Sequence, residues 1–139
     1  MNRQKAREEA FLMLCESGFD AERTADEIYE TAKITRDVEE DAFTRDCLEG
    51  VIAHRAEIDE VIAAHASNWQ RSRISVITAA ILQLGTYEMR YRTDIPLNVS
   101  LNEAIELSKR YDDEKAKAFV NGVLNAIASE VRALRGDEG

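Results

Sequence analysis

The stretch VITAAILQLGTYEMRY, residues 76–91, decides the fold class of this chain. Its apolar side chains recur every three or four residues, which is the spacing of one buried face of an amphipathic helix. They are Ile77, Ala80, Ile81, Leu84, Tyr87 and Tyr91. The stretch ends at Thr93-Asp94-Ile95-Pro96, where proline restricts the preceding residue and predicts a turn.

Helical patterns continue outward from this stretch in both directions. The other expected helices are residues 2–17, ended by Gly18; residues 24 to about 33, opened by the capping box Thr24–Glu27; residues 37–66, with a break near 55–57; and two helices on either side of Asp112 and Asp113. No segment of useful length alternates with period two. We therefore expect an all-α fold of about six or seven helices in two packed three-helix bundles.

The two bundles are expected to form one domain over residues 1–139. The polar piece around residues 66–75 predicts the seam between an N-terminal bundle, about 1–67, and a C-terminal bundle, about 68–135. Gly50, Gly85 and Gly122 lie inside helical patterns, where each costs about 1 kcal/mol relative to alanine. We interpret them as points where neighbouring helices approach closely, with a ligand-binding role as the alternative.

Charge and composition favour a binding protein over an enzyme. The net charge is −9, and residues 20–60 alone hold 14 acids and 5 bases, so the ends of the chain are left free to form a basic surface. No apolar run is long enough for a membrane span or a signal peptide, and we expect a cytoplasmic protein. Two cysteines and two histidines lack metal-ligand spacing. No constellation supports acid–base or nucleophilic chemistry, so neither a metal nor a cofactor is expected.

Several motifs in fixed order resemble one known family. They are Trp69-x-x-x-Arg73-Ile74, Ala80-Ile81-Leu82, Tyr87-Glu88, Asp94-Ile95-Pro96, Asn102-Glu103-Ala104-Ile105-Glu106-Leu107 with Lys109, Phe119-Val120-Asn121-Gly122-Val123-Leu124, and an opening Ala6-Arg7-Glu8-x-Ala10. Together they resemble the NusB family of bacterial transcription antitermination factors. The resemblance implies binding of boxA-type single-stranded RNA jointly with a small-subunit ribosomal protein, NusE, within the transcription elongation complex that makes ribosomal RNA.

Two basic clusters are candidates for RNA binding. Arg3, Lys5 and Arg7 open the first helix and can neutralise phosphates, although a solvated, frayed turn is an equal reading of the spacing. The resemblance implies that this segment binds RNA. Lys115 and Lys117 lie beside Phe119, whose ring can stack on a base or pack in the core.

Further residues are candidates for contacts with RNA or with the protein partner. Arg71 and Arg73 are additional phosphate candidates, and Arg73 fits a structural ion pair equally well. The resemblance implies that the protein partner docks on the helix 76–91, with Thr78, Tyr87 and Glu88 as candidate contacts. Tyr87 also fits the apolar core stripe.

The helix 76–91 also departs from the family. Relatives often carry an acid at the position of Thr78 and arginines at those of Ala79 and Gln83, so the partner's surface must differ or this interface must be weaker. The alternative function is a purely protein-binding helical adaptor whose homodimer covers the RNA face.

Overall fold

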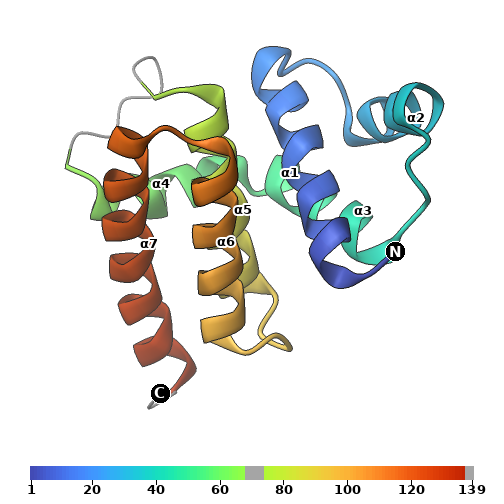
Figure 1. Ribbon diagram of the computed structural model, residues 1–139. Helices are drawn as coiled ribbons and strands as arrows, with labels where there is room; N and C mark the ends of the chain where they lie inside the picture. Colours follow the sequence, from blue (N-terminus) through green and yellow to red (C-terminus); the bar gives the residue numbers. More distant parts are fainter. Residues whose placement is uncertain (68–73, 137–139) are drawn as a thin grey trace. The chain divides into compact units, whose positions relative to one another are not determined.

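The computed structural model describes residues 1–67 and 74–136 (Figure 1). It divides the chain into two compact units, Met1–His54 and Arg55–Gly139. The described residues form seven helices: α1 Arg3–Phe19, α2 Ala25–Arg36, α3 Ala42–Ala53, α4 Arg55–His65, α5 Val76–Tyr91, α6 Leu97–Tyr111 and α7 Glu114–Arg135. The expected all-α fold is confirmed.

In the first unit, α1 packs against both α2 and α3. The Thr44 hydroxyl at the start of α3 donates to the Ala6 carbonyl of α1 at 2.9 Å, which anchors one helix on the other. Aliphatic and aromatic side chains from all three helices fill the interior. They include Phe11, Met13, Leu14, Ile28, Tyr29 and Leu48, each almost fully excluded from solvent.

The local signals of the first unit were largely correct. The capping box opens α2: the Glu27 N–H donates to the Thr24 hydroxyl at 3.1 Å, and the Thr24 N–H donates to the Glu27 carboxylate at 2.8 Å. The expected stop at Gly18 was wrong, because α1 continues to Phe19 and ends where Asp20 becomes extended. Gly18 does not take the positive φ that lets glycine end a helix, so it is simply part of the last turn.

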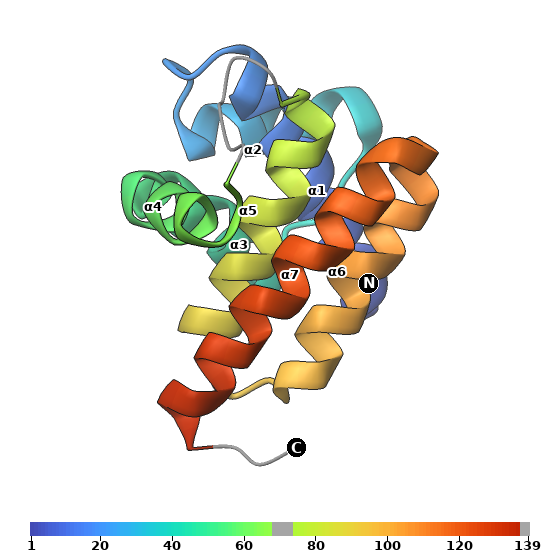
Figure 2. The ribbon, with the colours of Figure 1, turned by 90° about the vertical axis from the view of Figure 1, so that its left-hand side faces the viewer.

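In the second unit, α5 is the central helix and packs against α4, α6 and α7. Figure 2 shows α6 and α7 running side by side, and α4 nearly end-on beside α5. The buried side chains come from every helix of the unit. They include Ile58, Ile62, Ile81, Leu84, Ala104, Leu124 and Ile127. The predicted turn lies between α5 and α6, where the Ile95 N–H donates to the Arg92 carbonyl at 3.0 Å.

The long predicted stretch 37–66 contains two helices that belong to different units. His54 separates α3 from α4, close to the break expected at 55–57, and α4 packs on α5 and α7. Residues 68–73 of the expected seam lie outside the described residues. The division into bundles of about 1–67 and 68–135 stays a prediction.

The helical glycines have different surroundings. A Cβ added at Gly85 would lie 3.0 Å from both the Ala104 Cβ and the Leu124 Cδ2, so close helix packing is confirmed there. The same interpretation was wrong for Gly122, since a Cβ there would meet none of the described residues within 4 Å. That residue lies on the exposed side of α7, where packing does not demand glycine. Close packing at Gly50 stays a prediction.

No helix in the described part of the chain is long and apolar enough to cross a membrane.

Candidate nucleic-acid and partner interface

The two arginines at the start of α1 contact one aromatic ring. The Arg3 and Arg7 guanidinium carbons lie 4.2 and 5.1 Å from the centroid of the Phe43 ring, so both make cation–π contacts with it. Arg7 is only 2% exposed, whereas Arg3 reaches solvent. Burial therefore gives Arg7 a structural position, and leaves Arg3 as the arginine of the pair that a ligand can reach.

Lys5 belongs to an ion-pair cluster on another side of the same helix. Its amine lies 3.4 Å from Glu8 and 3.3 Å from Glu9, and the hydrogen bond and charge of Glu9 raise the pKa of Lys5. Glu9 is also 2.6 Å from the guanidinium of Arg36. The three predicted N-terminal cations thus do not form one uncompensated patch.

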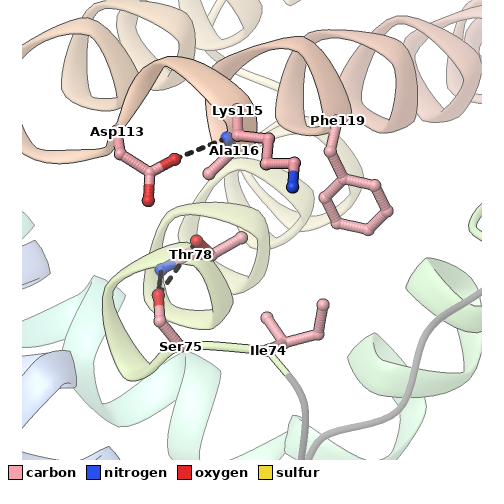
Figure 3. Close-up of a pocket in the computed structure, with 7 residues that line it drawn as sticks. All are labelled: Ile74, Ser75, Thr78, Asp113, Lys115, Ala116 and Phe119. Carbon is pink, nitrogen blue, oxygen red and sulfur yellow. Dashed lines mark hydrogen bonds between the residues drawn. The ribbon is translucent and has the colours of Figure 1, made fainter.

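The start of α7 forms one wall of an open pocket of about 300 Å³ (Figure 3). The pocket is lined by Ile74, Ser75, Thr78, Asp113, Lys115, Ala116 and Phe119. Asp113 caps α7, and its carboxylate accepts from the Ala116 N–H at 2.8 Å. The Lys115 and Phe119 side chains extend from α7 over Ile74. A cation, an aromatic ring and a carboxylate therefore share one hollow.

The two lysines of the predicted patch differ in their contacts. Lys117 pairs with Glu114 at 2.9 Å. Lys115 is exposed, and no acidic side chain in the described ranges pairs with it. Of the two, Lys115 is better placed to contact a phosphate.

Phe119 also lines a second hollow of about 290 Å³, with His65, Ala66, Ser67, Ala118, Gly122 and Val123. The ring is partly exposed, so it is not a fully packed core side chain. Gly122 and Ala118 have no side-chain atoms beyond Cβ, so little protrudes from α7 beside the ring. Open space therefore lies beside the Phe119 ring along this stretch of α7.

The three predicted partner-contact residues are buried within the chain. Thr78 is 4% exposed, Tyr87 5% and Glu88 1%. The Tyr87 ring stacks on Tyr91 with centroids 5.3 Å apart, and Glu88 accepts from the Ser100 hydroxyl at 3.3 Å. These residues help to hold α5 in place, and they offer a partner little exposed surface, although Thr78 also lines the open pocket.

The departures on α5 are interior as well. Ala79 and Gln83 are each 2% exposed, and the Gln83 amide donates to Asp59 of α4 at 2.9 Å. Gln83 thus joins two helices of the second unit.

Asp112, between α6 and α7, accepts from the Thr78 hydroxyl at 2.9 and 3.0 Å. Burial raises the pKa of Asp112, and the hydrogen bond from Thr78 acts in the opposite direction. The loop between α6 and α7 is thereby fixed to the first turn of α5. This contact shapes the floor of the pocket that Phe119 overhangs.

Sequence reasoning missed Asp113 and Ile74 as pocket residues. Asp113 was interpreted only as part of a helix break, although an acid just before a helix is a capping signal that places its carboxylate at the helix end. Arg71 and Arg73 lie outside the described residues. Among the residues described, no group of three or more His, Cys, Asp or Glu side chains could hold a metal ion.

The sequence of this chain is similar to those of known proteins from one family. The sequence profile of the NusB family matches residues 4–129. The chain is 43% identical over 132 residues to the transcription antitermination protein NusB of Bacillus subtilis, covering 94% of this chain and 98% of that protein.

Solved structures agree with the sequence match. A structure of T. maritima NusB superposes with a TM-score of 0.81 at 31% identity, covering 94% of this chain and 92% of that one. The chain is also similar to a chain in a crystal structure of antitermination factors NusB and NusE with double-stranded RNA. There the TM-score is 0.79 at 27% identity, with 92% of this chain and 96% of that chain covered.

Proposed function

The chain belongs to the NusB family of transcription antitermination proteins, and from that premise we propose that it binds boxA-type single-stranded RNA jointly with NusE. The family is one of non-enzymatic transcription factors, so binding is its whole activity. A similar structure holds NusB, NusE and RNA together, which supports both partners. We place the complex on elongating RNA polymerase in the cytoplasm, where it supports ribosomal RNA transcription.

The observation that carries the RNA proposal is the partly exposed Phe119 ring beside Lys115. Bases of single-stranded RNA stack on aromatic faces, and a neighbouring cation pairs with the phosphate backbone. Phe119 and Lys115 are four residues apart on α7, which places them on one side of the helix. The hollows that the ring lines provide room for a base.

The N-terminal segment adds a weaker electrostatic contribution. Arg3 and Lys5 reach solvent, but Lys5 is compensated by Glu8 and Glu9. We therefore assign base contacts and the main phosphate contact to α7, and a supporting phosphate contact to the start of α1. Arg71 and Arg73 remain additional candidates from the sequence.

We propose that NusE docks on the surface around α5, as the family resemblance implies. Thr78, Tyr87 and Glu88 are buried, so their role is to set the shape of the surface that NusE meets. Partner binding then depends on the packing of α5 more than on any single exposed contact.

The test is RNA binding by the chain in complex with its cognate NusE. Fluorescence anisotropy with labelled boxA RNA compares the wild type with Phe119→Ala at low salt. Loss of one stacked base is expected to weaken binding roughly five- to hundredfold. Phe19→Ala is the matched control, because Phe19 is an aromatic residue that is 79% exposed on the first unit and lines neither hollow.

Two results would contradict the proposal. The first is a complex that binds no RNA at low salt, and the second is a folded Phe119→Ala variant that binds like the wild type. Light scattering on the same samples measures the molar mass. A mass that stays dimeric, with no RNA bound when NusE is present, would favour the self-associating adaptor.

A further inference from the structure

Asp113, an exposed residue at the start of α7, has one carboxylate oxygen with no hydrogen-bond partner among the described residues, so water can reach it. Asp113 Oδ1 accepts from the Ala116 N–H at 2.8 Å and completes the helix cap. Oδ2 accepts from no donor in the described part of the chain, and Figure 3 shows it clear of the capping bond. Asn and Ser cap helices as well as Asp does, so the cap itself does not require this second oxygen.

The other polar groups that line the pocket are already engaged or cannot accept. The Ser75 hydroxyl accepts from the Thr78 N–H at 3.0 Å and donates its proton to the Thr78 hydroxyl at 3.0 Å. The Thr78 hydroxyl in turn donates to Asp112. Lys115 can only donate. Asp113 Oδ2 is therefore the strongest open acceptor in a hollow whose aromatic wall is Phe119.

We propose that Asp113 selects the base that enters this pocket, favouring a base with an exocyclic amino group over uracil. The inference rests on the proposed function, because it assigns base preference to the same RNA site. Adenine, cytosine and guanine each carry an amino group that donates to a carboxylate. Uracil offers one N–H flanked by two carbonyl oxygens, and these face the negative carboxylate unfavourably.

A base contact would offset the electrostatic cost of this carboxylate. A negative group near a phosphate site weakens RNA binding unless it is compensated. A hydrogen bond from a base amino group supplies that compensation, and uracil supplies it poorly. Lys115, on the same wall of the pocket, is placed to contact the phosphate while Asp113 contacts the base edge.

Cytosine and uracil test this directly, because they have the same ring size and differ at the amino position. The probe is a twelve-nucleotide oligouridine RNA in which a single cytosine is moved through every position. Affinity for the complex of the chain with NusE is measured by fluorescence anisotropy. At the position that enters the pocket, cytosine is expected to bind roughly tenfold more tightly than uracil, as for one hydrogen bond to a charged group.

Asp113→Asn keeps an oxygen for the cap but places an amide donor where Oδ2 lies. The cytosine preference is expected to vanish or to turn toward uracil. Asp113→Ser also caps the helix and removes the second oxygen without adding the amide, so it should abolish the preference. Glu114→Gln is the matched control: it removes the same charge one residue away, from a side chain that is 92% exposed and lies outside the pocket. It should leave the cytosine-to-uracil ratio unchanged.

The outcomes separate the two proposals. Binding of RNA with no cytosine preference at any position, or with the same preference in wild type, Asp113→Asn and Asp113→Ser, would overturn this inference alone. Absence of binding to every RNA would overturn the proposed function and this inference with it. Thermal melting of each variant shows that the compared proteins are folded.

Discussion

The Thr78 hydroxyl donates to the Asp112 carboxylate, 2.9 and 3.0 Å from its two oxygens. This contact joins the first turn of α5 to the residue that ends α6. It gives Thr78 a structural role in the second unit, and the partner contact that the family resemblance implies for Thr78 stays a prediction. The floor of the pocket beside Phe119 depends on it.

Thr78→Val is expected to destabilise the chain by about 1–2 kcal/mol, because it removes the side-chain donor of a half-buried carboxylate. Burial already raises the pKa of Asp112, so its ionised form is unfavourable in the folded state. That cost is present at neutral pH and disappears as the pH falls through the folded pKa. Urea denaturation at pH 7 and at pH 3 should therefore show the larger loss at pH 7.

The matched control for this prediction is Thr86→Val on the same helix. Thr86 is fully buried, and its hydroxyl has no hydrogen-bond partner among the described residues. Its replacement should be neutral or slightly stabilising. Equal losses of stability for both variants would show that the hydrogen bond from Thr78 to Asp112 does not stabilise the fold.

Helix positions could be predicted from the sequence because their signals are local. The capping box at Thr24 and the break at Pro96 each depend on residues a few positions apart. Helix pairing depends on residues far apart in sequence, and so the local pattern did not predict that α4 packs on α5 and α7. Its buried Ile58 and Ile62 suit any apolar surface, and nothing in their spacing tells which helix covers them.

The sequence predicted which residue types form the candidate site. It did not predict which of those side chains are exposed to solvent. Phe119 and Lys115 line one pocket, as their spacing on one helix face suggested. Arg7 and Glu88 are charged, which usually indicates a surface position, yet both are nearly fully buried. Their burial depends on Phe43 and Ser100, partners far along the chain that no local pattern identifies.

Gly122 and Gly85 should respond oppositely to alanine. Gly122→Ala is expected to stabilise the chain by up to about 1 kcal/mol through helix propensity, since a Cβ there meets nothing within 4 Å. Gly85→Ala places its Cβ 3.0 Å from the Ala104 Cβ, which is fixed to a neighbouring helix backbone. Overpacking should cost about 1–3 kcal/mol and outweigh the propensity gain.

Denaturant titration of both glycine variants checks this pair. The opposite signs are the diagnostic result, and destabilisation by Gly122→Ala would mean that its surface is covered in the free chain. Reduced RNA affinity of a stable Gly122→Ala variant would indicate that RNA passes close to α7 at this point.

Glu40 should make the first unit sensitive to acid. Arg45 and Lys33 each lie 2.7 Å from it, and their hydrogen bonds lower the pKa of Glu40 to about 2. Because this folded pKa is depressed, the stabilisation is present above the ordinary glutamate pKa of about 4.5 and is lost as the pH falls toward 2. Its side chain is 50% exposed, so the pair contributes no more than about 1 kcal/mol.

Glu40→Gln should therefore reduce stability at pH 7 and make little difference near pH 2. Thermal melting at both pH values measures the change, with Glu22→Gln, an exposed acid of the loop between α1 and α2, as the control. An equal effect of Glu40→Gln at both pH values would contradict the ionic origin of the stabilisation.

Substitutions of Arg7 and Arg3 should differ in their effect on the stability of the chain. Arg7→Met removes a buried cation–π contact and is expected to cost about 2 kcal/mol, whereas Arg3→Met changes an exposed side chain and should cost less than about 1 kcal/mol. If both variants have the same urea midpoint of unfolding as the wild type, neither cation–π contact with Phe43 contributes to stability. A mutational test of RNA binding in this segment should therefore change Arg3 and Lys5 and leave Arg7 intact.

Lys115 and Lys117 should differ in the salt dependence of RNA binding. Each phosphate contact to single-stranded RNA contributes about 0.7 to the slope of log affinity against log salt. Lys115 has no ion pair within the described ranges, so Lys115→Ala should lower the slope by about that amount and weaken binding most at low salt. Lys117 is already paired with Glu114 at 2.9 Å, and its removal should change the slope less.

Anisotropy titrations of the NusE complex between about 50 and 200 mM salt resolve the difference. The contrast matters more than either value, because both variants remove one positive charge from the same helix turn. A general effect of net charge would lower both slopes equally. If Lys117→Ala lowers the slope more than Lys115→Ala does, the phosphate does not lie beside Lys115, and RNA must cross α7 on the side of Lys117.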